Sequence, residues 1–433
     1  MKHKIFPSAA ILLAALACFC LCGCRTSEKE PDLIIVDFSQ DYPLLDLKLP
    51  DIAEISYIPL QGKDSARVLS LATALPNNIY IGSEHIFIGD FAPYRKDGEW
   101  HRFSPQSGSL MLFGSNGEYL NTVFRSKNEG EDILFGLNAP YVVFPKKKEI
   151  YAFSAYGKFI RGFKYNGETI STGPNIGTEY KECIVSGDTI AWLLHRRQNF
   201  KILCHNVCTG ETAPIQTHTF SRPFDNDVLM TGHHITVTGT GAYITTPRTD
   251  TIYHLNRNME IVPKLYNVRH TEDADNLACP LVETDEYILL CNIQDSQSRH
   301  DKRFRNANYI YLKGERQMYR LPWEGESILN EHNTTLTPNI IAIALPISQL
   351  KENYNLLPDD LKRITDASAE DDNPVLMIMR FGKQLPKVSS LVQEWPKSEF
   401  SYLQVLNFTV LINLSLTSEF NIIDTNREGD RII

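Results

Sequence analysis

The chain carries a cluster of cysteines near its start, and cysteine thiols can bind metals, form disulfides or carry a lipid. Four of the nine cysteines fall within residues 17–24, which read ACFCLCGC. They close a run of apolar and small residues from Ile5 to Leu21, which itself follows Lys2 and Lys4. This order of basic, apolar and then small residues is typical of a secretory signal, and the run is at the short limit for a membrane-spanning helix.

The end of this segment resembles the bacterial lipobox, in which an aliphatic residue and two small residues precede a cysteine. The four positions here are Leu21-Cys22-Gly23-Cys24. The resemblance implies cleavage behind Gly23 and lipid attachment to Cys24, while the three earlier cysteines leave with the signal. Two or three acyl chains on one cysteine make such anchoring stable. An ordinary signal with chance cysteines, or a cut before Cys18, is the alternative.

The other cysteines do not indicate a metal site or a disulfide framework. Five remain, an odd number that cannot all pair. The stretch CHNVC, residues 204–208, lacks a second pair of ligands at a zinc-site spacing. The Gly-x-Gly of TGTGAY, from Thr238, lies inside a predicted strand hairpin, and no P-loop, Gly-x-Ser-x-Gly or His-Glu-x-x-His motif is present. We therefore predict no metal, no cofactor and no assigned catalytic residue.

Aromatic and basic residues gather in two segments that could bind a ligand, PYRKDGEWHRFSPQSG (93–108) and QDSQSRHDKRFRNAN (294–308). Aromatic rings offer apolar faces to a sugar or peptide, and guanidinium groups offer forked donors to a carboxylate or sulfate. Tolerated surface loops with solvated charges are the alternative interpretation. The candidate ligand-binding residues are Tyr94, Trp100, His101, Arg102, Arg299, Arg303 and Arg305.

Composition favours a globular extracytoplasmic protein and argues against a nucleic-acid partner. The formal net charge of −9 becomes −11 once Lys2 and Lys4 leave with the signal. A net acidic chain argues against nucleic acid as the main partner. About 410 residues then remain, which suits one large repeat fold or two domains.

The elements that must position these side chains show an internal repeat. LMLFGSNGEYLNT, from Leu110, and FIRGFKYNGETIST, from Phe159, share a Phe, two further residues and then Asn-Gly-Glu. An Asn-Gly pair between alternating apolar runs predicts a β-hairpin with a type I′ turn. A period in the forties predicts β-propeller blades of about four strands each. Four equivalent glutamates stand 50, 43 and 49 residues apart, at Glu118, Glu168, Glu211 and Glu260.

The repeat predicts an all-β fold, a six-bladed β-propeller closed by its N-terminal strand. Five units show four strands each, whereas the sixth shows only Asn339–Leu345 and Val375–Phe381 clearly. DIAEISYIPL, residues 51–60, alternates well and has no partner of its own. Pairing it with the sixth unit closes the ring and removes both open edges.

Three insertions interrupt the pattern, each between the second and third strand of its blade. They are 93–108, 294–308 and 348–372, and the last predicts two short helices in the last blade. Without them, residues 52–383 allow about 46 residues per blade for six blades. Because strands alternate in direction, we expect all three insertions on one face of the propeller, with the lipid tether on the opposite face.

The chain therefore divides into four expected segments: a signal peptide, a tether, the propeller and a C-terminal extension. LQVLNFTVLINLSL, from Leu403 in the extension, is too short and too polar to span a membrane. We expect the extension to be an added strand or hairpin on the propeller, or a poorly ordered tail, and the polar residues of this stretch favour the tail. The four segments cover 1–23, 24–49, 50–383 and 384–433.

Several stretches together resemble the six-bladed β-propeller lipoproteins of Bacteroidetes, which are distantly similar in pattern to NHL-type propellers. In chain order they are ISYIPL, TDTIYHL with VPKLYNV, and LKENYNLLPDDL with EDDNPVLMIMRF. The resemblance covers roughly residues 50–383 and implies an outer-membrane lipoprotein, on the periplasmic side or at the cell surface. It departs at SKNEGEDI, where such proteins have a Gly-Pro-Gly-Glu-like loop, and in the long extension.

Two classes of function are compatible with this pattern, because propellers host both. The favoured hypothesis is a non-enzymatic module or scaffold that captures a glycan, a peptide or a partner lipoprotein on one propeller face. The alternative is a hydrolase or lyase that acts on a polysaccharide or peptide at the same face. An enzyme would need His101 or His300 beside a carboxylate or metal, and the sequence shows neither.

Overall fold

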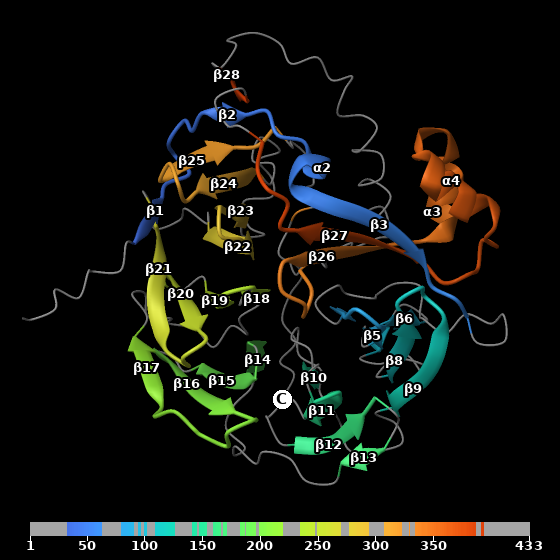
Figure 1. Ribbon diagram of the computed structural model, residues 1–433, viewed down its shortest axis with the longest axis horizontal. Helices are drawn as coiled ribbons and strands as arrows, with labels where there is room; N and C mark the ends of the chain where they lie inside the picture. The colour runs from blue at the N-terminus through green and yellow to red at the C-terminus, as the bar shows by residue number, and fades with distance from the viewer. Residues whose placement is uncertain are drawn as a thin grey trace, which may run out of the picture.

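The computed structural model is a ring of β-sheets around a central axis (Figure 1). The sheets form the six blades of a β-propeller, so the predicted six-bladed fold is confirmed. The structure describes residues 33–62, 79–90, 94–96, 99–101, 109–125, 141–144, 147–153, 159–165, 168–170, 182–186, 188–195, 199–219, 234–246, 249–269, 277–293, 307–322, 329, 334–386 and 391–393.

Five blades are antiparallel sheets whose four strands follow the chain from the axis outward. Blade one contains β4 (Ile79–Ile81), β5 (His85–Asp90), β8 (Ser109–Gly114) and β9 (Tyr119–Arg125). Blade two contains β10 (Tyr141–Phe144), β11 (Glu149–Phe153), β12 (Phe159–Lys164) and β13 (Thr169–Ile170). Blade three contains β14 (Glu182–Ser186), β15 (Thr189–His195), β16 (Asn199–Asn206) and β17 (Gln216–Thr219). Blade four contains β18 (His234–Thr238), β19 (Gly241–Thr245), β20 (Thr251–Asn256) and β21 (Ile261–Asn267). Blade five contains β22 (Leu277–Glu283), β23 (Tyr287–Ile293), β24 (Asn308–Leu312) and β25 (Gln317–Arg320).

The repeated glutamate closes the hairpin between the third and fourth strands of its blade. In blade one, the Gly114 N–H donates to Glu118 O at 2.8 Å, and the Gly117 N–H donates to Gly114 O at 2.9 Å. Gly117 has a φ of +87°, whereas Asn116 does not take a positive φ. The turn is therefore a type I turn with a G1 bulge rather than the type I′ turn expected. The closing bond recurs in Lys164 to Glu168, Asn206 to Glu211, and Asn256 to Glu260.

The fourth strand of blade three starts later than the sequence predicted. The expected strand was 211–216, but β17 begins at Gln216, which pairs with Ile202. Before it, Thr212 forms an isolated bridge to His205. One residue more therefore lies between Thr212 and Gln216 than between Ile202 and His205. This extra residue makes a β-bulge, which an alternating pattern alone does not reveal.

Blade six combines strands from the start and the end of the propeller. β26 (Ile340–Leu345) pairs antiparallel with β27 (Val375–Phe381), and β3 (Ala53–Pro59) pairs antiparallel with β27 over its full length. On the inner side, Thr334 forms an isolated bridge to Ile341. The predicted closure of the ring through the N-terminal strand is thereby confirmed.

The hydrophobic core lies between neighbouring blades. Met377 and Met379 of β27 pack with residues of blade five, whereas Leu376 and Ile378 pack with residues of blade one. Successive residues of a strand point to opposite faces of the sheet. β27 is therefore buried on both faces, which explains its almost wholly apolar sequence, VLMIMRF.

The segment before β3 lies along the outer edges of blades four and five. β1 (Ile34–Val36) pairs in parallel with β21, and β2 (Leu44–Leu45) pairs in parallel with β25. β28 (Val392–Gln393) pairs antiparallel with β2, and the short helix α2 (Leu49–Ile52) leads into β3. Sequence reasoning assigned residues 24–49 to a tether and did not foresee these short strands.

Two of the three insertions contain described elements. The hairpin of β6 (Tyr94–Lys96) and β7 (Glu99–His101) lies between β5 and β8. In blade six, α3 (Ile347–Glu352), a 3-10 turn (Tyr354–Leu356) and α4 (Asp359–Asp366) lie between β26 and β27. The helical insertion predicted in the last blade is thereby confirmed. The insertion between β23 and β24 lies outside the described residues.

Candidate functional site

All three insertions leave the propeller at the same end. Each connects the second to the third strand of its blade, and antiparallel neighbours place these connections at one end of the inner strands. Blades five, six and one are neighbours in the ring (Figure 1). We call this the insertion-bearing end of the molecule.

The predicted binding residues lie only partly among the described residues. In the β6–β7 hairpin, Tyr94 is opposite His101, and Arg95 is opposite Trp100. The backbone pairing therefore places Tyr94, Trp100 and His101 in two adjacent cross-strand pairs of one hairpin. Outside the described residues lie Arg102, Arg299, Arg303, Arg305 and the lipidation candidate Cys24.

The helical insertion forms one wall of an open groove with a volume of about 880 Å³. The other wall is β3, which contributes Ile55, Tyr57 and Pro59, while α4 contributes Arg363 and Ile364. This volume is within the range of small-ligand sites, which span roughly 300–1,000 Å³. The sequence showed both walls as elements but gave no sign of the groove, because its walls are about three hundred residues apart in the chain.

The lining of the groove is mixed in polarity. Asp360 and Arg363 form an ion pair on the exposed side of α4, where solvent leaves such a pair little net effect on stability. Burial raises the pKa of Tyr57, and the Asp360 carboxylate adds to that shift. The Tyr57 phenol therefore stays protonated at neutral pH and can donate a hydrogen bond. Ile55 and Ile364 add apolar surface to the groove.

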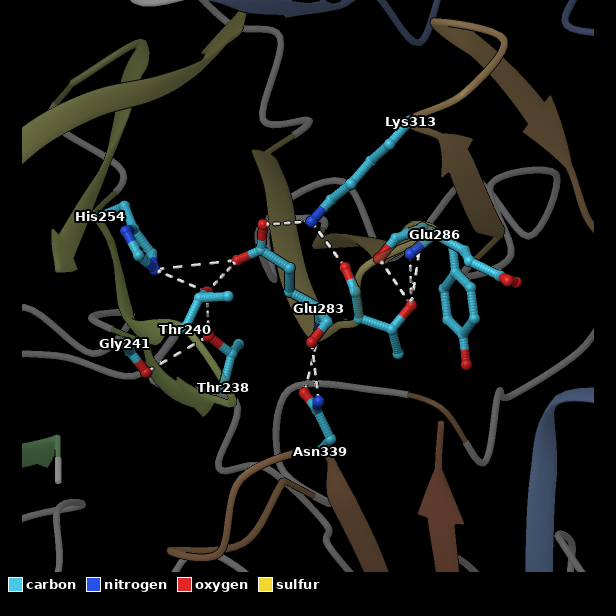
Figure 2. A network of polar contacts seen from close by, with 10 residues as sticks. Thr238, Thr240, Gly241, His254, Glu283, Glu286, Lys313 and Asn339 are labelled. Atoms are coloured by element: carbon cyan, nitrogen blue, oxygen red, sulfur yellow. Dashed lines mark hydrogen bonds and ion pairs between the residues drawn. The ribbon is translucent and has the colours of Figure 1, made fainter. Parts of the chain in front are cut away.

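A buried polar network links blades four, five and six at the other end of the inner strands (Figure 2). Glu283, the last residue of β22, is 3% exposed and accepts hydrogen bonds from Lys313 Nζ at 2.8 Å and Thr240 Oγ1 at 2.6 Å. His254 Nε2 lies 3.2 Å from Thr240 Oγ1 and 3.8 Å from Glu283 Oε2. Asn339 accepts from the Glu283 N–H at 3.0 Å and donates to the Glu283 carbonyl at 2.7 Å.

The charges of this network follow from its surroundings. Burial acts to raise the pKa of Glu283, but hydrogen bonds from Lys313 and Thr240 and the positive charges of Lys313 and Lys264 hold it below its ordinary value. Burial lowers the pKa of His254; Glu283 opposes that shift, and the two lysines reinforce it. At neutral pH the network therefore holds an ionised Glu283 and a neutral His254.

Thr240, His254 and Glu283 contain the residue types of a nucleophile, a base and a carboxylate, but their arrangement differs from a catalytic triad. In a triad, the carboxylate contacts the ring nitrogen that faces away from the nucleophile. Here both Thr240 Oγ1 and the Glu283 carboxylate approach His254 Nε2. Thr240 also donates its proton to Glu283 rather than to the imidazole. The arrangement joins blades and does not activate the threonine.

Hydrogen bonds also link blade six to blade one. Thr337 Oγ1 accepts from the Ile81 N–H at 2.7 Å and donates to the Ile81 carbonyl at 3.0 Å, which joins blade six to blade one. Sequence reasoning missed this set of contacts because its members lie in separate turns and strands and carry no motif. In TGTGAY, for example, it identified only the turn and not the partner of Thr240.

Comparison with known proteins concerns the fold. No protein-family profile matches the sequence, and no curated protein is detectably similar to it. A Bacteroides fragilis protein described as exported is 17% identical with a TM-score of 0.53, over 81% of this chain and 100% of that chain. A member of the DUF4221 family from Bacteroides vulgatus is 8% identical with a TM-score of 0.41, over 77% and 99%. Virginiamycin B lyase from Staphylococcus aureus is 10% identical with a TM-score of 0.34, over 75% and 99%.

Of these three proteins, only the one from Bacteroides fragilis has a TM-score above 0.5, and at 17% identity this similarity shows a shared fold alone. Within the part of the chain that the structure describes, none of the helices has the length and apolar character needed to cross a membrane. Lipidation and the similarity to lipoprotein propellers stay predictions from the sequence. The chain is a six-bladed β-propeller whose structural neighbours include a Bacteroides protein described as exported.

Proposed function

We propose that this protein is a binding module of the cell envelope, held at the outer membrane by a lipid on Cys24. It captures a glycan, a peptide or a partner lipoprotein at the insertion-bearing end. One observation carries the proposal: the insertions of three neighbouring blades share that end.

The path of the chain supports an orientation in which this end faces away from the membrane. β1 runs parallel to β21, which begins after the third-to-fourth strand turn of blade four, at the end remote from the insertions, so the chain before Ile34 enters from the side of that remote end. A lipid on Cys24 connects to the propeller through the residues that precede β1. The insertion-bearing end therefore faces outward, where a capture surface is useful.

The residue types at this end suit a carbohydrate or anionic ligand. Tyr94 and Trp100 supply aromatic rings, and Arg102, Arg303 and Arg305 supply donors for a carboxylate or sulfate. Aromatic residues and arginines are also the residues that most often dominate binding energy at interfaces.

A binding screen tests the proposal with the soluble, unlipidated Cys24→Ala protein, a glycan array and a peptide library. We expect the double variant Trp100→Ala with Arg303→Ala to weaken binding of a selected ligand by about tenfold or more, since each 1.4 kcal/mol changes affinity tenfold. The control double variant is Arg257→Ala with Tyr266→Ala, which likewise removes one arginine and one aromatic residue, here in blade four, and should bind normally. Equal binding by both double variants would refute the assignment. Cleavage of a selected ligand would instead favour the hydrolase or lyase.

A further inference from the structure

The outer edge of β3 presents backbone groups that no described residue uses as hydrogen-bond partners. The Leu60 N–H donates to Pro374 O at 3.3 Å. In an antiparallel pair every second residue bonds to the partner strand, so Ile58 and Ser56 also bond to β27. Ile55 and Tyr57 lie between them and direct their N–H and C=O groups away from β27. Among the described residues, no hydrogen bond reaches these four groups. Pro59 occupies the next outward position, where its missing N–H removes no ladder bond.

The groove follows this edge rather than one face of the strand. Ile55 and Tyr57 pack toward the core between blades five and six, whereas Leu60 packs toward the core between blades six and one. All three nevertheless line the groove, together with Ser56. A cavity that contacts residues of both faces runs along the backbone edge, where the free N–H and C=O groups lie.

In the two preceding blades, strands from the chain's own ends cover the equivalent edge. β1 covers β21 in blade four, and β2 followed by β28 covers β25 in blade five (Figure 1). Unpaired outer strands are sites of aggregation, which proteins avoid by covering them. Of these three neighbouring blades, the described residues leave only the edge of blade six without an added strand.

The sequence after β28 contains one more segment with the pattern of a strand. In LNFTVLINLSL, residues 406–416, every even-numbered position is apolar, and every odd-numbered position except Leu411 is polar. Phe408, Val410 and Ile412 belong to the aromatic and β-branched types that favour strands. The pattern predicts a strand with one apolar face and one polar face.

The described chain after β28 ends on the outer edge of blade five, the neighbour of blade six. Leu391, directly before β28, packs against the hydrophobic cluster between these two blades, as Ile55 and Tyr57 do. Residues 394–405 separate β28 from the predicted strand. At up to roughly 3.3 Å per residue, twelve residues reach about 40 Å, enough to pass from one blade to the next.

We propose that residues 406–416 add as a further strand to the outer edge of β3 and fill the groove. Their backbone pairs with Ile55 and Tyr57, and their apolar face packs on Tyr57 and Ile364, while their polar face meets solvent. Because the segment is tethered beside the groove, its effective concentration there is on the order of millimolar. This inference concerns the groove and not the ligand of the proposed function. An external ligand would then bind at the insertions of blades five and one.

Hydrogen exchange that resolves single amides tests the proposal on the full mature chain and on a chain that ends at Gln393. We expect the amides of Ile55 and Tyr57 to exchange at least about tenfold more slowly in the full chain. The amides of Ser56 and Ile58, which bond to β27, are internal controls and should exchange equally in both. A synthetic peptide of residues 406–416 should restore slow exchange to the shortened chain.

A matched pair of variants in the full chain keeps the test decisive if the shortened chain aggregates. Val410→Asp places a charge on the apolar face and should speed exchange of the Ile55 and Tyr57 amides. Thr409→Asp places the same charge on the polar face, one residue away, and should leave exchange unchanged.

Two results would overturn the proposal. One is fast exchange of Ile55 and Tyr57 in the full chain, and the other is slow exchange that survives both truncation and Val410→Asp. The second result would indicate another occupant, such as a peptide retained from the cell. Neither depends on the ligand screen, so this inference and the proposed function can fail separately.

Discussion

Glu283 is expected to hold three blades together, and replacement with glutamine tests that role. Its carboxylate accepts from both Lys313 and Thr240. Glutamine keeps one acceptor oxygen for one of these two donors. Its NH₂ group then faces the other donor, and no hydrogen bond forms there. Loss of a charge-assisted hydrogen bond costs about 1.5–3 kcal/mol. Lys313 is 27% exposed and can recover part of this cost in water. We therefore expect Glu283→Gln to lower the free energy of unfolding by about 2 kcal/mol.

Urea denaturation of the unlipidated protein at neutral pH measures this change. The matched control is Glu286→Gln, the same substitution in the same hairpin. Glu286 is exposed, and among the bonds described its carboxylate accepts only the Leu385 N–H at 2.9 Å, so its replacement should cost about 0.5 kcal/mol or less. If Glu283→Gln costs no more than Glu286→Gln, the network does not stabilise the ring and the reasoning is wrong.

The pH dependence of the same variant provides a second measurement. The pKa of Glu283 in the folded protein lies below its ordinary value of 4.5. Its stabilising contribution is therefore complete above pH 4.5 and is lost as pH falls through the folded pKa. The difference in unfolding free energy between the native protein and Glu283→Gln should shrink as pH falls below 4.5. A difference that stays constant into acid would contradict the assignment of charge to this residue.

Other predictions concern acid sensitivity, one hairpin and the anchor. The pKa of His254 lies below 6.5, so stability should decline as pH falls below 6.5, where the unfolded chain takes up the proton more readily. His254→Gln should reduce that decline in urea midpoints compared at about pH 7 and pH 5. Gly117→Ala would bring a Cβ into overlap with Pro59 O at a φ of +87°, and we expect a loss of about 2–4 kcal/mol in urea denaturation. Gly210→Ala, at a φ of +75° with nothing within 4 Å, should cost only about 1 kcal/mol. Cys24→Ala should abolish incorporation of a palmitate analogue and release soluble protein, while Cys22→Ala should change little; equal labelling of both would contradict the lipidation site.

The sequence predicts the ring because each blade repeats its own local chemistry. A hairpin with Asn-Gly-Glu and alternating strands can be recognised within about fifteen residues, without any distant partner. Closure was also predictable, because DIAEISYIPL is a strand that lacks a neighbour of its own. The exact turn type was not, since Asn116 tolerates a positive φ in principle and avoids it in the structure.

The sequence does not show the short edge strands, the groove or the polar network, because each forms between residues that are far apart along the chain. β1 and β2, with three and two residues, are too short for a detectable alternation. The groove forms where β3 meets α4, and the network forms where Thr240, Glu283 and Asn339 meet from three blades. Each of these residues has an ordinary local context, so no pattern along the chain marks it.

The pairing of β3 with β27 also sets the order in which the molecule can be made. Ser56 and Arg380, bonded across these strands, are 324 residues apart along the chain. Contacts at such separations fold slowly, because the loop between them must close first. β3 emerges early in synthesis and has no β27 to pair with until the last blade has followed. A chain that stops before blade six therefore keeps two unpaired sheet edges, and completion of the ring distinguishes full-length molecules from fragments.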